Sequence, residues 1–156
     1  MSSIIQFTVG DGGFPDKLIK KASQSPGEFI QRTNAMLQTI QNEVQFHIPR
    51  GQHCPGGGKG GTTKSAIRKQ LTTMGGEVYA DEHTAPWFKW FEDGRGPVKV
   101  KQAKALHFCI QGKHIFRKSA GASKGADSMG KGAKTSEPMV RRKADEMGKW
   151  LEDLGD

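Results

Sequence analysis

The sequence predicts an α+β fold. In this fold a small antiparallel or mixed sheet is packed by a long N-terminal helix and a C-terminal helix, with long glycine- and lysine-rich loops. Two segments repeat apolar residues every three or four positions, as amphipathic helices do, and several short segments alternate apolar and polar residues, as strands do. The 156 residues suit one domain, residues 1–156. Many of the 21 glycines lie in two stretches, so we expect flexible loops at about 50–64 and 119–136.

The first third of the chain predicts a strand, a short helix and a long helix. The stretch IIQFTV alternates like a strand, and residues 14–22, FPDKLIKKA, predict a short helix with Pro15 near its first turn. Ser25 and Glu28 have the spacing of a capping box, and Pro49 with Gly51 ends the helix that follows. The helix carries one apolar stripe: Phe29, Thr33, Met36, Leu37, Ile40, Val44 and Ile48. We interpret it as a core helix.

The rest of the chain predicts shorter elements and a closing helix. Residues 62–71 predict a short helix or a turn, and residues 76–81 a strand with Val78 inward. The stretch AKALHFCIQGKHIFRKS predicts a β-hairpin that turns at Gln111-Gly112. The closing helix is expected to start at Ser136 as its cap, with proline in the first turn. Its apolar stripe is Val140, Ala144, Met147, Leu151 and Leu154.

The net charge of +8 is distributed unevenly. Residues 49–76 carry +5 without any acid, residues 77–94 carry −4, and residues 95–136 carry +9. Such segregation predicts surfaces of opposite sign, which contact either nucleic acid or the acidic surfaces of neighbouring protein copies. The chain opens without a basic leader or a long apolar run, so we expect a soluble protein with neither a signal peptide nor a membrane-spanning helix.

The stretch CPGGGKGGTTKS raises the possibility of a phosphate-binding loop. Such a loop has the pattern G-x-x-x-x-G-K-[ST] between a buried strand and a helix. Here Gly58 and Lys64-Ser65 stand at the right positions, but Thr63 occupies the place of a glycine, and the preceding segment has a helical pattern. We therefore expect no nucleotide cofactor, and interpret the stretch as a cationic connection.

Histidines and cysteines do not have the spacing of a common zinc site, so we expect no metal. The candidates are His47, His53, Cys54, His107, Cys109 and His114. The two cysteines also predict no disulfide framework, which favours a reducing compartment. Glu92 and Asp93 are neighbours in an expected turn, where paired acid–base chemistry is unfavourable. No catalytic residue is predicted, and we expect that the protein is not an enzyme.

Several stretches together resemble one known family. They are IIQFTVGDGGFPDKLIKKA, the helix exit QNEVQFHIPRG, the segment GTTKSAIRKQL, the stretch VYADEHTAPWFKWFEDGRGP with Glu92 and Gly94 on an acid-x-glycine pattern, and TSEPMVRRKADEMGKWL. In this order they are similar to the small neck or tail-completion proteins of tailed bacteriophages, a group related to the minor tail protein Z. Arg95 stands where that pattern has threonine, and the basic stretch 119–136 is additional.

The resemblance implies a structural virion protein at the head–tail junction, assembled in the bacterial cytoplasm. It implies a sixfold or twelvefold ring, with connector or head-closure proteins and tail-tube or tail-terminator proteins as neighbours, possible DNA in the channel, and no membrane. Because tryptophan and arginine often carry interface energy, the residues that we expect at interfaces lie in the aromatic stretch and the glycine-lysine loops. They are Trp87, Trp90, Phe91, Arg95, Lys59, Lys64, Lys124 and Lys131. One tryptophan of the pair is expected in the core.

Two alternatives remain open at the level of sequence. The first is a basic DNA-binding protein that acts alone, whose binding to random duplex DNA depends steeply on salt. The second is a phage nuclease of unrecognised type, whose metal-dependent cutting is lost in Glu92→Gln or Asp93→Asn.

Overall fold

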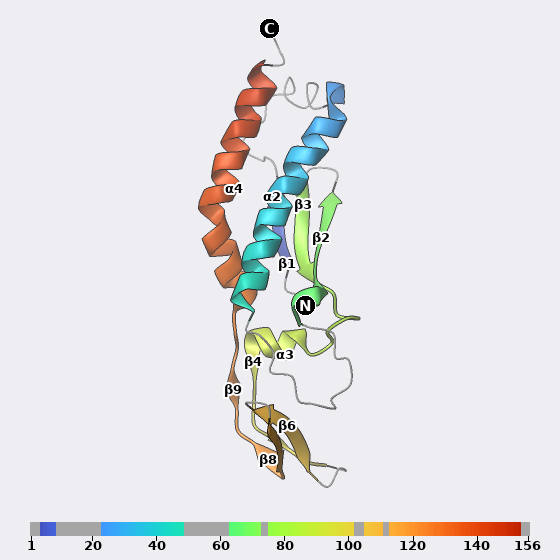
Figure 1. Ribbon diagram of the computed structural model, residues 1–156, viewed down its shortest axis with the longest axis vertical. Coiled ribbons are helices and arrows are strands. Elements are labelled where there is room, and N and C mark those ends of the chain that lie inside the picture. Colours follow the sequence, from blue (N-terminus) through green and yellow to red (C-terminus); the bar gives the residue numbers. More distant parts are fainter. Residues whose placement is uncertain are drawn as a thin grey trace.

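The computed structural model describes residues 4–8, 23–48, 63–72, 75–101, 105–110 and 113–153, with only the backbone described for 4–8 and 107–110. Two long helices and a sheet form a body, and a two-stranded arm extends from one end of it (Figure 1). The expected short helix at 14–22 and most of the glycine-rich stretch 50–64 lie outside the described residues. The α+β class predicted from the sequence is confirmed.

The helix α2 (Pro26–His47) has the bounds that its pattern predicts. Its apolar stripe is buried except for the half-buried Phe29, and Met36 and Leu37 have no exposed surface. Ser25 precedes the helix and Pro26 occupies its first position, but the expected capping box is wrong in one respect, since the Ser25 side chain makes no capping hydrogen bond. Glu28 instead pairs with Arg32, with 2.8 Å between Oε1 and Nη2.

The helix α4 (Ser128–Asp153) runs antiparallel to α2 and packs along it (Figure 1). It begins eight positions before Ser136, so the expected cap and the expected loop over residues 128–136 are wrong. The small residues there do not prevent burial, because Gly132 lets α4 approach the backbone of Val44 closely. Residues 119–120 and 123–124 form short strands instead of an irregular loop.

The sheet of the body has three antiparallel strands in the order β1-β3-β2. They are β1 (Ile4–Thr8), β2 (Ile67–Thr72) and β3 (Gly75–Ala80). The 3-10 helix η1 (Thr63–Ala66) leads into β2, so the segment expected as a short helix or turn is a helical turn followed by a strand. Gly76 of β3 faces Leu37 so closely that a Cβ at Gly76 would overlap that side chain.

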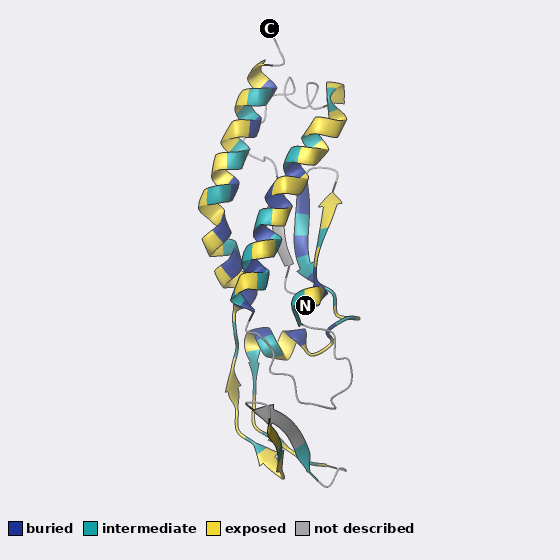
Figure 2. Ribbon diagram, viewed as in Figure 1, coloured by how far each residue is buried: buried dark blue, intermediate teal, exposed yellow. Residues whose placement is uncertain are grey.

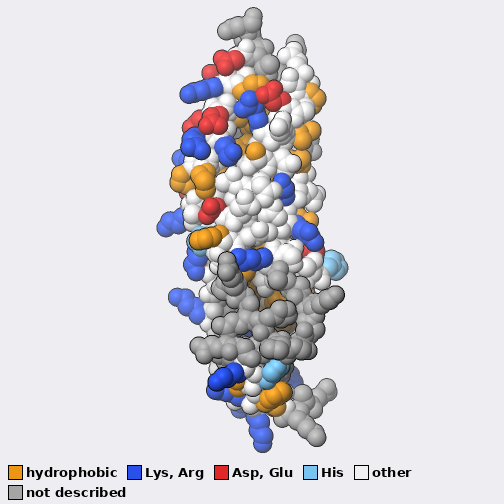
Figure 3. Space-filling view, viewed as in Figure 1, with side chains coloured by type: hydrophobic (Ala, Val, Ile, Leu, Met, Phe, Trp, Pro, Cys, Tyr) orange, Lys and Arg blue, Asp and Glu red, His pale blue; other side chains and the backbone are white. Residues whose placement is uncertain are grey.

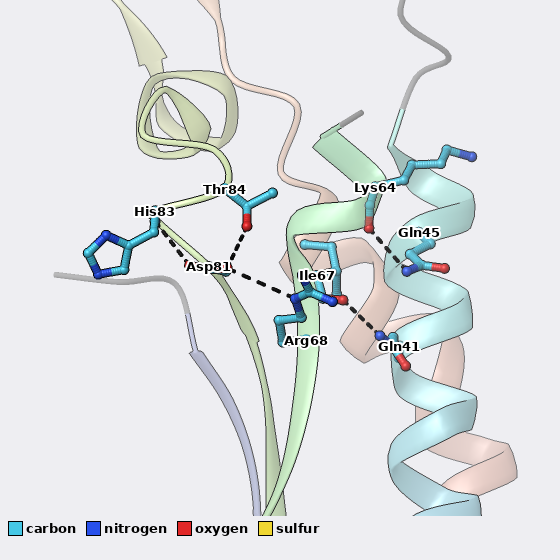
Figure 4. A network of polar contacts seen from close by, with 8 residues as sticks. All are labelled: Gln41, Gln45, Lys64, Ile67, Arg68, Asp81, His83 and Thr84. Atoms are coloured by element: carbon cyan, nitrogen blue, oxygen red, sulfur yellow. Dashed lines mark hydrogen bonds and ion pairs between the residues drawn. The ribbon is translucent and has the colours of Figure 1, made fainter. Parts of the chain in front are cut away.

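Side-chain amides of α2 fasten the helix to the entry of β2 (Figure 4). Gln41 Nε2 donates to the Ile67 carbonyl at 2.7 Å, and Gln45 Nε2 donates to the Lys64 carbonyl at 3.1 Å. Both bonds satisfy backbone carbonyls that no sheet partner reaches at this edge, and they fix the position of η1 relative to α2.

The core lies between the helix pair and the sheet (Figure 2). The described residues with fully buried large side chains come from α2 and its C-cap Ile48, and from β2, β3 and α4. The C-terminal stripe is confirmed at Val140, Met147 and Leu151, which are buried, and Ala144 is half-buried; Leu154 lies outside the described residues.

Candidate functional site: a basic arm and its base

Residues 94–124, called the arm below, form a two-stranded antiparallel ribbon that returns on itself. Near the body β4 (Gly94–Arg95) pairs with β9 (Ser123–Lys124), and further out β5 (Val98–Lys99) pairs with β8 (Ser119–Ala120). Val100 N then donates to the Lys118 carbonyl at 3.1 Å. The ribbon ends in the predicted hairpin of β6 (Leu106–Ile110) and β7 (Lys113–Arg117), which is confirmed. The arm as a whole extends away from the helix pair, and β6 runs back from its far end toward the body (Figure 1).

A short helix, α3 (Phe88–Asp93), holds the base of the arm. Phe88 is buried against the core and its ring lies 5.8 Å from that of Phe91. Gly94 follows with φ of +83°, a conformation that favours glycine. A Cβ at Gly125, on the returning strand, would overlap the Glu92 carbonyl oxygen, so the two strands leave the body in close contact.

Glu92 joins the base of the arm to α4. Its carboxylate is buried, with Oε1 accepting from Ser128 N at 3.0 Å and Oε2 from Met129 N at 2.9 Å. These amides belong to the first turn of α4, where backbone N–H groups have no partner inside the helix and the dipole favours an anion. Glu92 is thus a capping group supplied by another element.

The sequence interpretation did not assign this role to Glu92. Glu92 stands four residues after Phe88, so both lie on one face of a short helix. This spacing is the sequence signal that could have placed Glu92 on the buried face. From its sequence this stretch is interpreted as an aromatic patch that ends in a turn, so the helical spacing of Phe88 and Glu92 is not used.

The two tryptophans of α3 and its cap are exposed. Trp87 keeps 41% of its surface and Trp90 keeps 64%. The expectation that one of them belongs to the core is wrong. The helical spacing turns Phe88 inward, so Phe88 occupies the core position and both tryptophans stay at the surface. Phe91 is half-buried and packs against the core.

The structure brings most of the expected interface residues to the base of the arm. Arg95 is half-buried and pairs with Ser123, while Lys124 is exposed and pairs with Gly94. Lys131 lies in the first turn of α4, where its Nζ donates to the Ala126 carbonyl at 2.5 Å.

The two remaining candidates do not join this group. Lys64 is half-buried in η1, beside α2. Lys59 lies outside the described residues.

Charge is the property that most distinguishes the arm from the body. Residues 94–124 contain eight Lys and Arg and no Asp or Glu. On the face drawn in Figure 3, acidic side chains lie over the helix pair and basic ones continue onto the end where the arm lies. Within the described part of the chain, none of the arm's Lys and Arg side chains forms an ion pair.

A polar turn connects β3 with α3 (Figure 4). Asp81 Oδ2 accepts from Thr84 Oγ1 at 2.5 Å, Oδ1 accepts from His83 N at 3.0 Å, and Arg68 Nε lies 4.0 Å from Oδ2. The Thr84 hydroxyl bond and the backbone N–H bonds lower the pKa of Asp81, although burial opposes them. Its carboxylate is therefore occupied in shaping the turn.

The described residues contain no group of three or more His, Cys, Asp or Glu side chains placed to hold a metal ion. Among the helices in the described ranges, none is long and apolar enough to cross a membrane.

Comparisons of the chain with family models, curated proteins and solved structures found no match.

Proposed function

We propose that this protein is a structural component of a phage neck or head–tail junction, and that it assembles as a ring without catalysing a reaction. The sequence stretches that resemble neck and tail-completion proteins motivate the proposal. The observation that supports it best is the base of the arm, where two exposed tryptophans adjoin a projecting ribbon. Large aromatic side chains are common anchors of protein interfaces.

The position of the acidic residues also favours a structural role over a nuclease. Glu92 is bound by two backbone amides of α4 and is therefore part of the scaffold. A loss of activity in Glu92→Gln would report folding as well as chemistry, so Asp93→Asn is the better test of the nuclease alternative. Asp93 is exposed at the end of α3. Metal-dependent DNA cutting that disappears in Asp93→Asn would support the nuclease and oppose our proposal.

The test of assembly is the size of the purified protein as its concentration rises. We expect sedimentation velocity to show concentration-dependent oligomers, and negative-stain microscopy to show sixfold or twelvefold rings. Mass spectrometry of purified virions should then find the protein in the particle. A monomer at high concentration, together with its absence from virions, would contradict the proposal.

Trp90→Ser tests whether the base of the arm carries the contact between copies. We expect association to weaken at least tenfold, because a central interface tryptophan typically contributes about 2 kcal/mol or more. Ile30→Ser is the control. Ile30 is also an exposed apolar residue, 50% exposed, but it lies near the start of α2, at the end of the body opposite the arm (Figure 1). Equal weakening in both variants would place the interface elsewhere.

A further inference from the structure

We propose that the arm binds double-stranded DNA through the phosphate backbone, without reading the base sequence. The inference goes beyond the structural role proposed above, and it stands without that role because it depends on the arm alone.

The distribution of charge favours DNA over a second copy of the chain. The chain has 24 basic residues (Lys and Arg) and 16 acidic residues (Asp and Glu). Eight basic residues and no acidic residue lie in the arm, so 16 basic and 16 acidic residues lie elsewhere. The rest of the molecule is thus neutral overall, so a second copy offers no net negative charge to balance the arm. Duplex DNA carries about one negative charge per 1.7 Å of its axis.

Part of the acidic block before the arm, residues 77–94, is already engaged within the molecule. Two of its carboxylates already have partners, Glu92 at the start of α4 and Asp81 in its own turn. Their charge is committed to holding the body together, so it is not available to a neighbouring arm.

The pairing of the ribbon places cations on both of its faces. Paired residues of an antiparallel ladder share a face, and successive residues alternate. Within the β4–β9 pair, Arg95 therefore shares a face with Ser123, whereas Lys124 lies on the other face. Further out, Lys99 shares a face with Ser119. The partners of these cations are small, so phosphates reach the charges without a bulky side chain between them.

The shape of the arm fits a duplex better than a single strand. The major groove of B-DNA is wide enough for a two-stranded β-ribbon. Single-strand binders add rows of aromatic side chains on which bases stack. Among the arm side chains that the structure describes, Phe116 is the large aromatic one, 65% exposed, and the remainder are basic, small or aliphatic.

The first measurement is the salt dependence of binding to a random-sequence 20-base-pair duplex, followed by fluorescence anisotropy. Each neutralised phosphate contributes about −0.9 to the slope of log K against log salt. With about four to seven contacts, we expect a slope of about −4 to −6. A slope near zero would overturn the proposal.

Two triple variants with the same net charge locate the binding surface. Lys99→Gln, Lys118→Gln and Lys124→Gln change the arm, while Lys89→Gln, Lys134→Gln and Lys149→Gln change exposed positions of the body. The arm variant should bind on the order of 10²-fold more weakly at 0.1 M salt and lose about three from the slope. The body variant should bind nearly as the wild type does. Equal weakening in the two would show that net charge, not the arm, binds DNA.

Amide chemical shifts of the wild-type protein provide a test that needs no variant. On addition of the duplex, the changes should fall on residues 95–101 and 113–124. If they fall on the helix pair, the proposal is wrong. If the arm variant keeps DNA affinity but loses self-association, the partner of the arm is another copy, which also overturns it. DNA binding by a protein that forms no rings would refute the neck role alone.

Discussion

Glu92 shows how one residue can decide the relation between two parts of the molecule. It lies in α3 at the base of the arm, yet both carboxylate oxygens accept from the first amides of α4. A charged group at a helix N-terminus stabilises unpaired N–H groups, and burial strengthens the effect. The same contact fixes where α4 starts and how the arm leaves the body.

Glu92→Gln should destabilise the protein by about 1–3 kcal/mol, because the amide replaces a charged acceptor and turns an NH₂ group toward a backbone donor. Urea denaturation followed by circular dichroism measures the change. Glu137→Gln removes an exposed pair with Arg141 and should cost less than about 0.5 kcal/mol. Similar costs for the two substitutions would mean that the buried contact contributes little.

Thr84→Val should raise the pKa of Asp81 toward its ordinary value of 3.8, because it removes the hydroxyl bond that lowers it. A lowered folded pKa contributes stability above the unfolded pKa, and this contribution is lost as the pH falls through the folded pKa. In the variant this pH-dependent contribution should therefore become smaller, because the folded pKa approaches the unfolded pKa. A carboxyl carbon NMR titration measures the pKa, with Thr39→Val in α2 as control. An unchanged pKa would contradict this prediction.

At the scale of elements, two of the three glycines of α4 have opposite roles. Gly132 lies where α4 crosses α2, and a Cβ there would lie 2.6 Å from the Val44 Cα. Gly148 lies in the same helix with nothing within 4 Å of such an atom. The first glycine is required by packing, and the second only lowers the helix propensity.

Gly132→Ala should destabilise the protein by about 1–3 kcal/mol, because the helices must separate. Gly148→Ala should stabilise it by up to about 1 kcal/mol, because alanine is the better helix former. Thermal unfolding of the two variants under the same conditions measures whether each substitution lowers or raises the stability. If Gly132→Ala proves neutral or stabilising, the helices do not approach each other as closely as the structure shows.

At the scale of the whole molecule, the body and the arm differ in burial and in charge. The buried hydrophobic residues of the described core all lie outside residues 94–124. The arm contributes the net charge, and the body contributes the packing that supports it. Folding and binding should consequently respond to different changes.

Replacing residues 96–122 by Asn-Gly tests this separation. Arg95 and Ser123 then remain paired across a two-residue turn, which suits a tight hairpin. We expect a cooperative transition with a Tm within a few degrees of the wild type, and loss of the DNA affinity proposed above. A Tm that falls by more than about 10 °C would show that the arm stabilises the body.

The sequence alone determined the local elements and the class. Apolar spacing identified α2, the C-terminal stripe, β1, β3 and the β6–β7 hairpin, because each depends on residues that are close in the chain. The expected short helix at 14–22 stays a prediction, as does the neck role.

Only the tertiary structure decided how these elements are used. Gly94 pairs with Lys124 across an arm that returns on itself, and local patterns do not show pairing at that separation. The helix α4 includes residues 128–136, whose composition predicted a loop. The close packing at Gly132 and the cap from Glu92 stabilise the helix there. Whether a small or acidic residue belongs to a surface or to a contact depends on the element that packs against it, and that element lies far away in the sequence.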